Sequence, residues 1–161
     1  SPASFSACDV FWSVGQHSLV GAAMAEKIYK SSEVALAFLL HDCAEAFTGD
    51  IISPLKKMIP GIGEAEHAIA RTIVVACGAW DKLKDYDVAG CVEIVDRRML
   101  STEKRDLLSP CEWPGADLAL PFAHIEIGLE WNLLDFALNI GPERVFRRMK
   151  DEFDRLMKVI Q

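Results

Sequence analysis

The segment EVALAFLLHDCAEAF, residues 33–47, constrains the fold of this chain more than any other part of the sequence. From Val34 to Leu40 it is apolar on every side, and a helix of that kind is stable only when other elements cover it completely. Ser31 and Ser32 precede it with hydroxyl groups that can cap a helix N-terminus. We therefore predict a central buried helix that begins near Glu33 and ends before Gly49.

Helical periodicity continues along the rest of the chain, whereas alternating stretches are few and Asn-Gly and Asp-Gly turns are absent. A hydrophobic content of 51% over 161 residues suits one folded domain. We predict an all-α fold, a compact single-domain bundle of about six helices spanning 1–161, with 1–11 an irregular N-terminal segment and the proline-rich 109–121 a loop. Besides the central helix, the predicted helices are 17–30, 63–77, 85–108, 122–138 and 142–159.

Charge and cysteine content narrow the function and the compartment. A net charge of −7 argues against binding to duplex nucleic acid, but not against a nucleotide substrate. The five cysteines form no CxxC pair, which suits a reducing cytoplasm, or the host cytoplasm for a phage-encoded protein. No apolar run approaches the roughly 20 residues that span a bilayer, so we expect no membrane partner.

Four ionisable residues stand at the end of the apolar segment: His41, Asp42, Glu45 and Asp50. Residues three and four apart share one side of a helix, so His41, Asp42 and Glu45 would project from the same helix end. Burying these groups without partners is costly, and either a metal ion or a buried arginine would compensate them. We favour a metal ion over a structural polar cluster, because Asp50 adds a further carboxylate nearby.

One His and one Asp make an incomplete site, so further ligands must come from elsewhere. His17 stands at the start of a predicted helix, where a lone histidine is more often a surface or capping residue. Asp96 follows an apolar stripe, and its alternative is an ion pair with Arg97 or Arg98, although helix neighbours do not face each other. Together with His41 and Asp42 these residues form a two-His, two-carboxylate set that suits Mn²⁺, Fe²⁺, Co²⁺ or Zn²⁺.

Three strings make the pattern specific: SVGQHSLVGAAMA, ALAFLLHDCAEAFTGDIISPLKKMIP and VDRRMLSTEKRDLL. They resemble the HD-domain superfamily of metal-dependent phosphohydrolases, in the branch that holds small deoxynucleotidases and phage dATP triphosphohydrolases. The resemblance covers about residues 11–108. It implies a divalent transition metal held by His17, His41, Asp42 and Asp96.

The resemblance also implies roles around that metal. Glu45 matches the carboxylate that acts on the attacking water, and Asp50 matches an acid beside the leaving group. A second divalent ion near these two residues is a further expectation. The positions matched to substrate binding are Lys56 and Lys57 for phosphate, and Trp12 and Val14 for the base and sugar.

The function we expect from the resemblance is hydrolysis of deoxynucleotides, with a dATP triphosphohydrolase as the leading hypothesis. The alternatives are a 5′-deoxynucleotidase on monophosphates and a non-catalytic HD module that binds a nucleotide. Monophosphatases of this type carry an Arg-Trp pair before the first His, and no Arg precedes Trp12 here. The apolar stretch 125–140 exceeds the needs of one core, so we expect a homo-oligomer, a dimer or hexamer, in which Glu103 is close enough to reach a neighbouring subunit's site.

Overall fold

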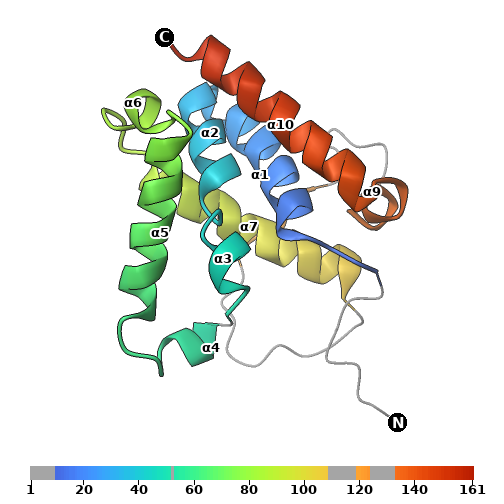
Figure 1. The fold of residues 1–161 in the computed structure, drawn as a ribbon. Helices are drawn as coiled ribbons and strands as arrows, with labels where there is room; N and C mark the ends of the chain where they lie inside the picture. Colours follow the sequence, from blue (N-terminus) through green and yellow to red (C-terminus); the bar gives the residue numbers. More distant parts are fainter. Residues whose placement is uncertain (1–9, 52, 109–118, 124–132) are drawn as a thin grey trace.

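The computed structural model describes residues 10–51, 53–108, 119–123 and 133–161, and these contain helices but no β-strand element. The predicted all-α fold is therefore confirmed (Figure 1). The helices are α1 (Val14–Tyr29), α2 (Ser32–Leu40), α3 (Glu45–Thr48), α4 (Ser53–Lys56), α5 (Ile62–Ala76), α6 (Trp80–Leu83), α7 (Ala89–Leu107), α9 (Leu133–Asn139) and α10 (Pro142–Val159).

The centre of the bundle is α2, as its composition requires. It packs against α1, α7 and α10, which surround it (Figure 1). Five of its nine residues are buried, and the Phe38 ring is fully enclosed. Ser31 caps the helix as predicted, because its hydroxyl accepts a hydrogen bond from the Val34 amide at 3.2 Å. The predicted central helix and its N-terminal cap are therefore confirmed.

A glycine lets α1 approach α2 closely. A Cβ atom added to Gly21 would fall on the Phe38 ring, so no larger residue fits without displacing that ring. Phe38 in turn lies between the two helices and the histidines described below. The missing side chain of Gly21 thus sets the spacing of the elements that carry the candidate site.

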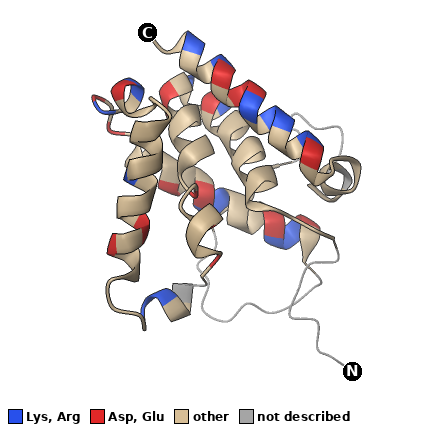
Figure 2. Cartoon of the chain, in the orientation of Figure 1, with Lys and Arg blue, Asp and Glu red and all other residues tan. Residues whose placement is uncertain are grey.

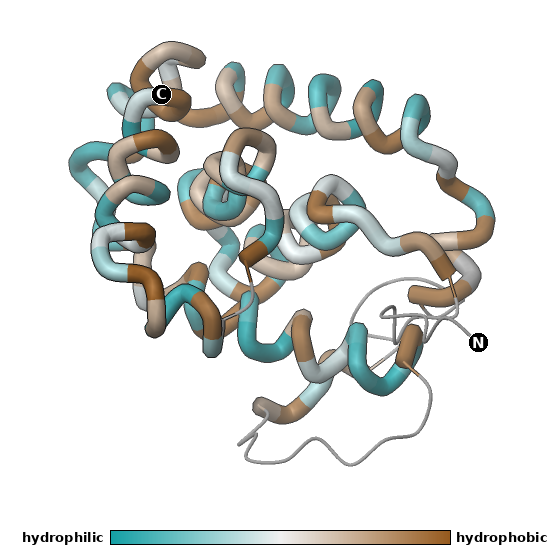
Figure 3. The backbone as a smooth tube through the Cα atoms, turned by 60° about the horizontal axis from the view of Figure 1, so that its bottom comes forward, coloured by the Kyte–Doolittle hydropathy of each residue, from teal (hydrophilic) through white to brown (hydrophobic). Residues whose placement is uncertain are grey.

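The outer helices are amphipathic and close the core from the sides. Figure 2 shows acidic and basic residues alternating along α10, whereas α2 is uncharged between Glu33 and Asp42. Figure 3 shows hydrophobic and hydrophilic positions alternating around the turns of α10. Its buried residues are Val145 and Leu156, and Pro142 occupies its first turn as predicted.

Two helix boundaries differ from the prediction in ways that affect the site. The first helix begins at Val14 rather than at 17, because Ser13 and Gln16 form a capping box that we did not identify. The central helix ends at Leu40 rather than continuing to 47. Between Leu40 and Phe47 several backbone amides donate hydrogen bonds to the carbonyl three residues earlier, as in a 3₁₀-helix. The Cys43 amide, for example, donates to the Leu40 carbonyl at 3.1 Å.

Other boundaries differ without affecting the site. The helix predicted over 85–108 begins at Ala89, and the separate four-residue helix α6 precedes it. The helix predicted over 122–138 is α9 in its described part, since Phe122 is not helical and 124–132 lie outside the described residues. Most of 1–11 and 109–121 also lies outside them. No helix of the described residues is long and apolar enough to cross a membrane.

Candidate metal centre

The four predicted ligands meet at one point although they come from three parts of the chain. His17 comes from the first turns of α1, His41 and Asp42 follow the end of α2, and Asp96 lies in α7. The Asp96 carboxylate is 3.3 Å from His17 Nε2 and 3.7 Å from His41 Nε2. Asp42 is 3.1 Å from His41 Nε2 and 4.0 Å from His17 Nε2. The fold therefore assembles all four.

A contact to the Nδ1 atom orients each imidazole ring. His17 Nδ1 lies 2.6 Å from a carboxylate oxygen of Glu103, and His41 Nδ1 lies 2.6 Å from the carbonyl oxygen of Phe38. Such partners place the proton on Nδ1 and leave the Nε2 lone pair free to bind a cation. Both Nε2 atoms are buried and lack a hydrogen-bond partner among the described residues.

Glu103 is a site residue that sequence reasoning placed only within reach of a neighbouring subunit's site. The same Glu103 oxygen that holds His17 also accepts a hydrogen bond from the Trp12 indole at 3.0 Å. Glu103 therefore lies beside the candidate ligands of its own chain. The indication in the sequence was its position seven residues after Asp96, which places both carboxylates on one face of α7.

Aromatic packing supports the two rings from below. The Phe38 ring centroid is 4.4 Å from that of His41 and 5.5 Å from that of His17. The two imidazole centroids are 5.4 Å apart. Because Phe38 is fully buried in a close-packed core, it restricts the movement of both imidazole rings.

The charges of the cluster depend on one another. Burial lowers the pKa of His17, but the carboxylates of Asp96 and Glu103 outweigh burial and raise that pKa to about 10. Burial likewise lowers the pKa of His41, and Asp42 and Asp96 raise it to about 9. Burial raises the pKa of Asp96, yet the two histidines hold it well below its usual range. The carboxylates therefore favour protonated imidazoles, and a metal ion would take the place of the proton on each Nε2 atom.

The residues fit a divalent transition metal. Ligand atoms of His17, His41 and Asp42 all lie within 4.8 Å of one another, and Asp96 adds a carboxylate beside both rings. Two buried Nε2 atoms without hydrogen-bond partners are the donors that such an ion would use. Arg97 is not a competing partner for Asp96, because it pairs with Glu93 at 3.0 Å.

A cleft of about 200 Å³ opens beside the centre. The carboxylate of Glu45 and the ammonium group of Lys56 line it, 3.9 Å apart. Burial, with the charges of Asp42 and Asp50, raises the pKa of Glu45 to about 7. That value suits a group that exchanges protons near neutral pH.

The remaining predicted residues lie farther out. Asp50 and Lys57 are exposed and do not line the cleft, and Val14 is 39% exposed on the first turn of α1. Trp12 is half-buried and packs edge-on against Phe136, with ring centroids 6.1 Å apart. The structure thus groups Glu45 and Lys56 with the metal ligands and leaves Asp50 and Lys57 at the rim.

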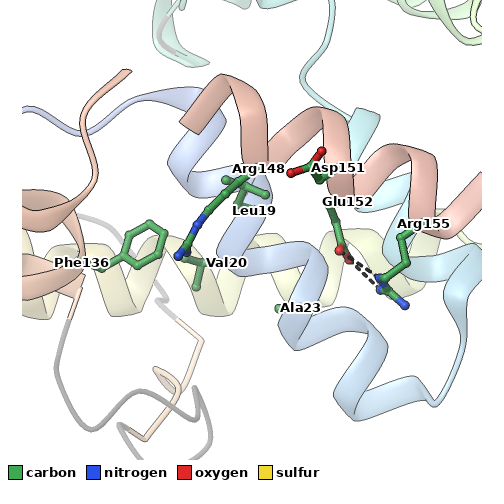
Figure 4. A pocket seen from close by; sticks show the side chains of 8 residues that line it. All are labelled: Leu19, Val20, Ala23, Phe136, Arg148, Asp151, Glu152 and Arg155. Atoms are coloured by element: carbon green, nitrogen blue, oxygen red, sulfur yellow. Dashed lines mark hydrogen bonds and ion pairs between the residues drawn. The ribbon is translucent and has the colours of Figure 1, made fainter. Parts of the chain in front are cut away.

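A larger cavity, about 410 Å³, lies elsewhere, between α1, α9 and α10 (Figure 4). Apolar side chains form one wall, and the charged residues of α10 form the other, where Arg155 pairs with Glu152 at 2.6 Å. None of the predicted site residues lines it. We assign the candidate site by its chemistry and not by the size of the cavity.

Comparison with known proteins yields one weak relative. The chain is 32% identical over 97 residues to the uncharacterized protein YfdR of Escherichia coli (strain K12). The match covers 60% of this chain and 49% of YfdR, so the chain spans about half the length of that relative. No family model and no solved structure matches the chain.

Proposed function

We propose that this chain is an HD-domain phosphohydrolase that uses a divalent transition metal to hydrolyse deoxynucleotides. The leading substrate is dATP, from which the enzyme would release triphosphate. The observation that carries the proposal is the convergence of two imidazole Nε2 atoms, buried and without hydrogen-bond partners, on the carboxylates of Asp42 and Asp96. The order of these residues along the chain, His, His-Asp and Asp, resembles that superfamily.

A divalent ion held by His17, His41, Asp42 and Asp96 supplies Lewis-acid activation of water and of a phosphoryl oxygen. Neighbouring residues orient the two histidines for binding such an ion. Glu103 and the Phe38 carbonyl keep the proton on Nδ1 of each histidine, and the Phe38 ring keeps both imidazoles from turning.

Glu45 has the position and the acidity of a general base. Its side chain is 15% exposed at the edge of the cleft, and its pKa of about 7 leaves part of the population ionised at neutral pH. The ionised carboxylate would take one proton from the attacking water. Attack at the α-phosphorus of dATP would release deoxyadenosine and triphosphate.

Lys56 supplies positive charge for the phosphate. Its side chain lines the cleft and is 30% exposed, so a ligand can reach it. The absence of an Arg before Trp12 supports a triphosphate over a monophosphate.

The decisive experiment is a panel of dNTPs and dNMPs with Mn²⁺, Co²⁺ or Zn²⁺, in which products are separated by chromatography. We expect deoxyadenosine and triphosphate from dATP. Inorganic phosphate from monophosphates alone would replace this function by that of a 5′-deoxynucleotidase. Nucleotide binding without turnover in any metal would point to a non-catalytic module.

A further inference from the structure

Lys56 has two carboxylates within reach, and their distances differ. Its Nζ atom is 3.0 Å from Glu66 Oε1 and 3.9 Å from Glu45 Oε1. Both carboxylate side chains are largely buried, with 16% and 15% of their surface exposed. The ammonium group therefore pairs with Glu66 and stands next to the candidate base without contacting it closely.

The two partners come from elements of unequal rigidity. Glu66 belongs to the second turn of α5, a helix of 15 residues. Lys56 ends α4, a helix of four residues within the proline- and glycine-rich connection between Gly49 and Gly61. An isolated turn of this length has little stability of its own, so a tertiary contact must fix the direction of the Lys56 side chain.

Glu66 also depends on Lys56. Apart from this ion pair, the buried Oε1 atom of Glu66 has no hydrogen-bond partner among the described residues. A buried carboxylate that loses its only cation is strongly disfavoured. Lys56 and the buried oxygen of Glu66 therefore depend on each other.

We propose that Glu66 is a positioning residue, which holds the Lys56 ammonium group in the cleft at the place from which it contacts substrate phosphate. This inference rests on the proposed function, because it assigns Lys56 to phosphate binding. Without Glu66, the nearest remaining carboxylate in the cleft is Glu45. Lys56 would then move onto the candidate base and be less available to the substrate.

The test is a double-mutant cycle with steady-state kinetics on dATP. Glu66→Gln removes the charge and keeps the shape, and Lys56→Met removes the ammonium group. We expect each single change to raise KM by about fivefold or more, because each weakens one charge contact to phosphate. We expect Glu66→Gln to cause no further rise in KM when Lys56 is already Met, because Glu66 acts through Lys56.

Glu64→Gln is the matched control, because Glu64 is an exposed residue of the same helix and the change removes the same charge. It should leave KM unchanged. The metal content of every variant should match that of the unaltered protein. Lys56→Met, which leaves the largely buried Glu66 carboxylate without its cation, should lower the thermal unfolding temperature. Additive effects of Glu66→Gln and Lys56→Met, or an unchanged KM in Glu66→Gln, would overturn the positioning role.

Binding measurements on the same variants test the role of Glu66 independently of the proposed function. If no nucleotide is hydrolysed in any metal, the proposed function fails, and the cycle is then measured as binding of inorganic tripolyphosphate to the metal-loaded protein by calorimetry. A non-additive loss of affinity would still support Glu66 as the residue that positions Lys56. Equal affinity of all variants, or no binding by the unaltered protein, would reject it.

Discussion

At the scale of single residues, Glu103 supports one histidine of the candidate metal centre without being a candidate ligand itself. One of its oxygens lies 2.6 Å from His17 Nδ1 and 3.0 Å from the Trp12 indole nitrogen. Its side chain is only 16% exposed, so water competes little for these contacts. Trp12, matched to base and sugar binding, is thereby joined to a metal ligand through a single carboxylate.

Glu103→Gln should lower metal affinity by about 10- to 100-fold, because outer partners of ligating histidines contribute that much. Competition with a chelating dye measures the effect. Glu93→Gln is the control on the same helix, since Glu93 is 64% exposed and pairs only with Arg97 in the described structure. Equal affinities of both variants would show that Glu103 does not support His17.

Asp42 and Glu45 should separate metal binding from turnover. Asp42→Ala removes a ligand and should abolish metal binding, activity and the stabilisation by metal, which is about 2.7 kcal/mol at a metal concentration of 100 times Kd. Glu45→Ala should keep the metal and that stabilisation but lose most of the turnover. Normal turnover by Glu45→Ala would exclude its role as the base.

At the scale of elements, the approach of α1 to α2 decides where the histidines stand. His17 belongs to α1 and His41 directly follows α2, and the Phe38 ring packs against both imidazoles. Gly21 allows this packing, because any side chain there would meet that ring. The tightened turn after Leu40 then directs His41 and Asp42 toward α1 and α7.

Gly21→Ala should destabilise the protein by about 1–3 kcal/mol, because overpacking outweighs the better helix propensity of alanine. It should also weaken metal binding, since the displaced ring supports both ligands. Urea denaturation and metal titration measure the two effects. Gly90→Ala in α7, where an added Cβ meets nothing within 4 Å, should be neutral or stabilising by up to about 1 kcal/mol. Destabilisation in both variants would refute the explanation.

At the scale of the whole molecule, the titrating groups predict how the metal-free protein responds to pH. The pKa values of His17, His41 and Glu45 are raised on folding, from 6.5 to about 10 and about 9 for the histidines and from 4.5 to about 7 for the carboxyl. A raised pKa contributes stability that is complete below the unfolded value and is lost as pH rises through the folded value.

The free energy of unfolding of the metal-free protein should therefore decrease from about pH 5 to about pH 10. The lowered pKa of Asp96 acts in the opposite direction, and its contribution is lost only as pH falls below its unfolded value of 3.8. Urea denaturation in EDTA across this range tests the decrease. Glu45→Gln should remove the part between pH 4.5 and 7. His17→Gln should make the decrease above pH 6.5 less steep and leave the part that His41 contributes. A stability that rises over this range would contradict the assigned charges.

Local sequence determined the all-α character, the central helix and two of the candidate ligands. The apolar run before His41 required a buried helix, and Ser31 marked its start, because periodicity and capping act over a few residues. The resemblance singled out His17 and Asp96 by their spacing along the chain. These predictions agree with the positions of all four residues in the structure.

Only the tertiary structure decided which groups surround those ligands. Glu103 contacts His17, and Glu66 pairs with Lys56. The sequence alone predicts neither pairing, because the partners meet only when the helices pack. Asp50, adjacent to the site in sequence, is exposed because the chain turns away at Gly49, whose φ is 74°. The physical reason is that helix packing brings together side chains that are distant in the sequence. That packing depends on close contacts such as the one between Gly21 and Phe38.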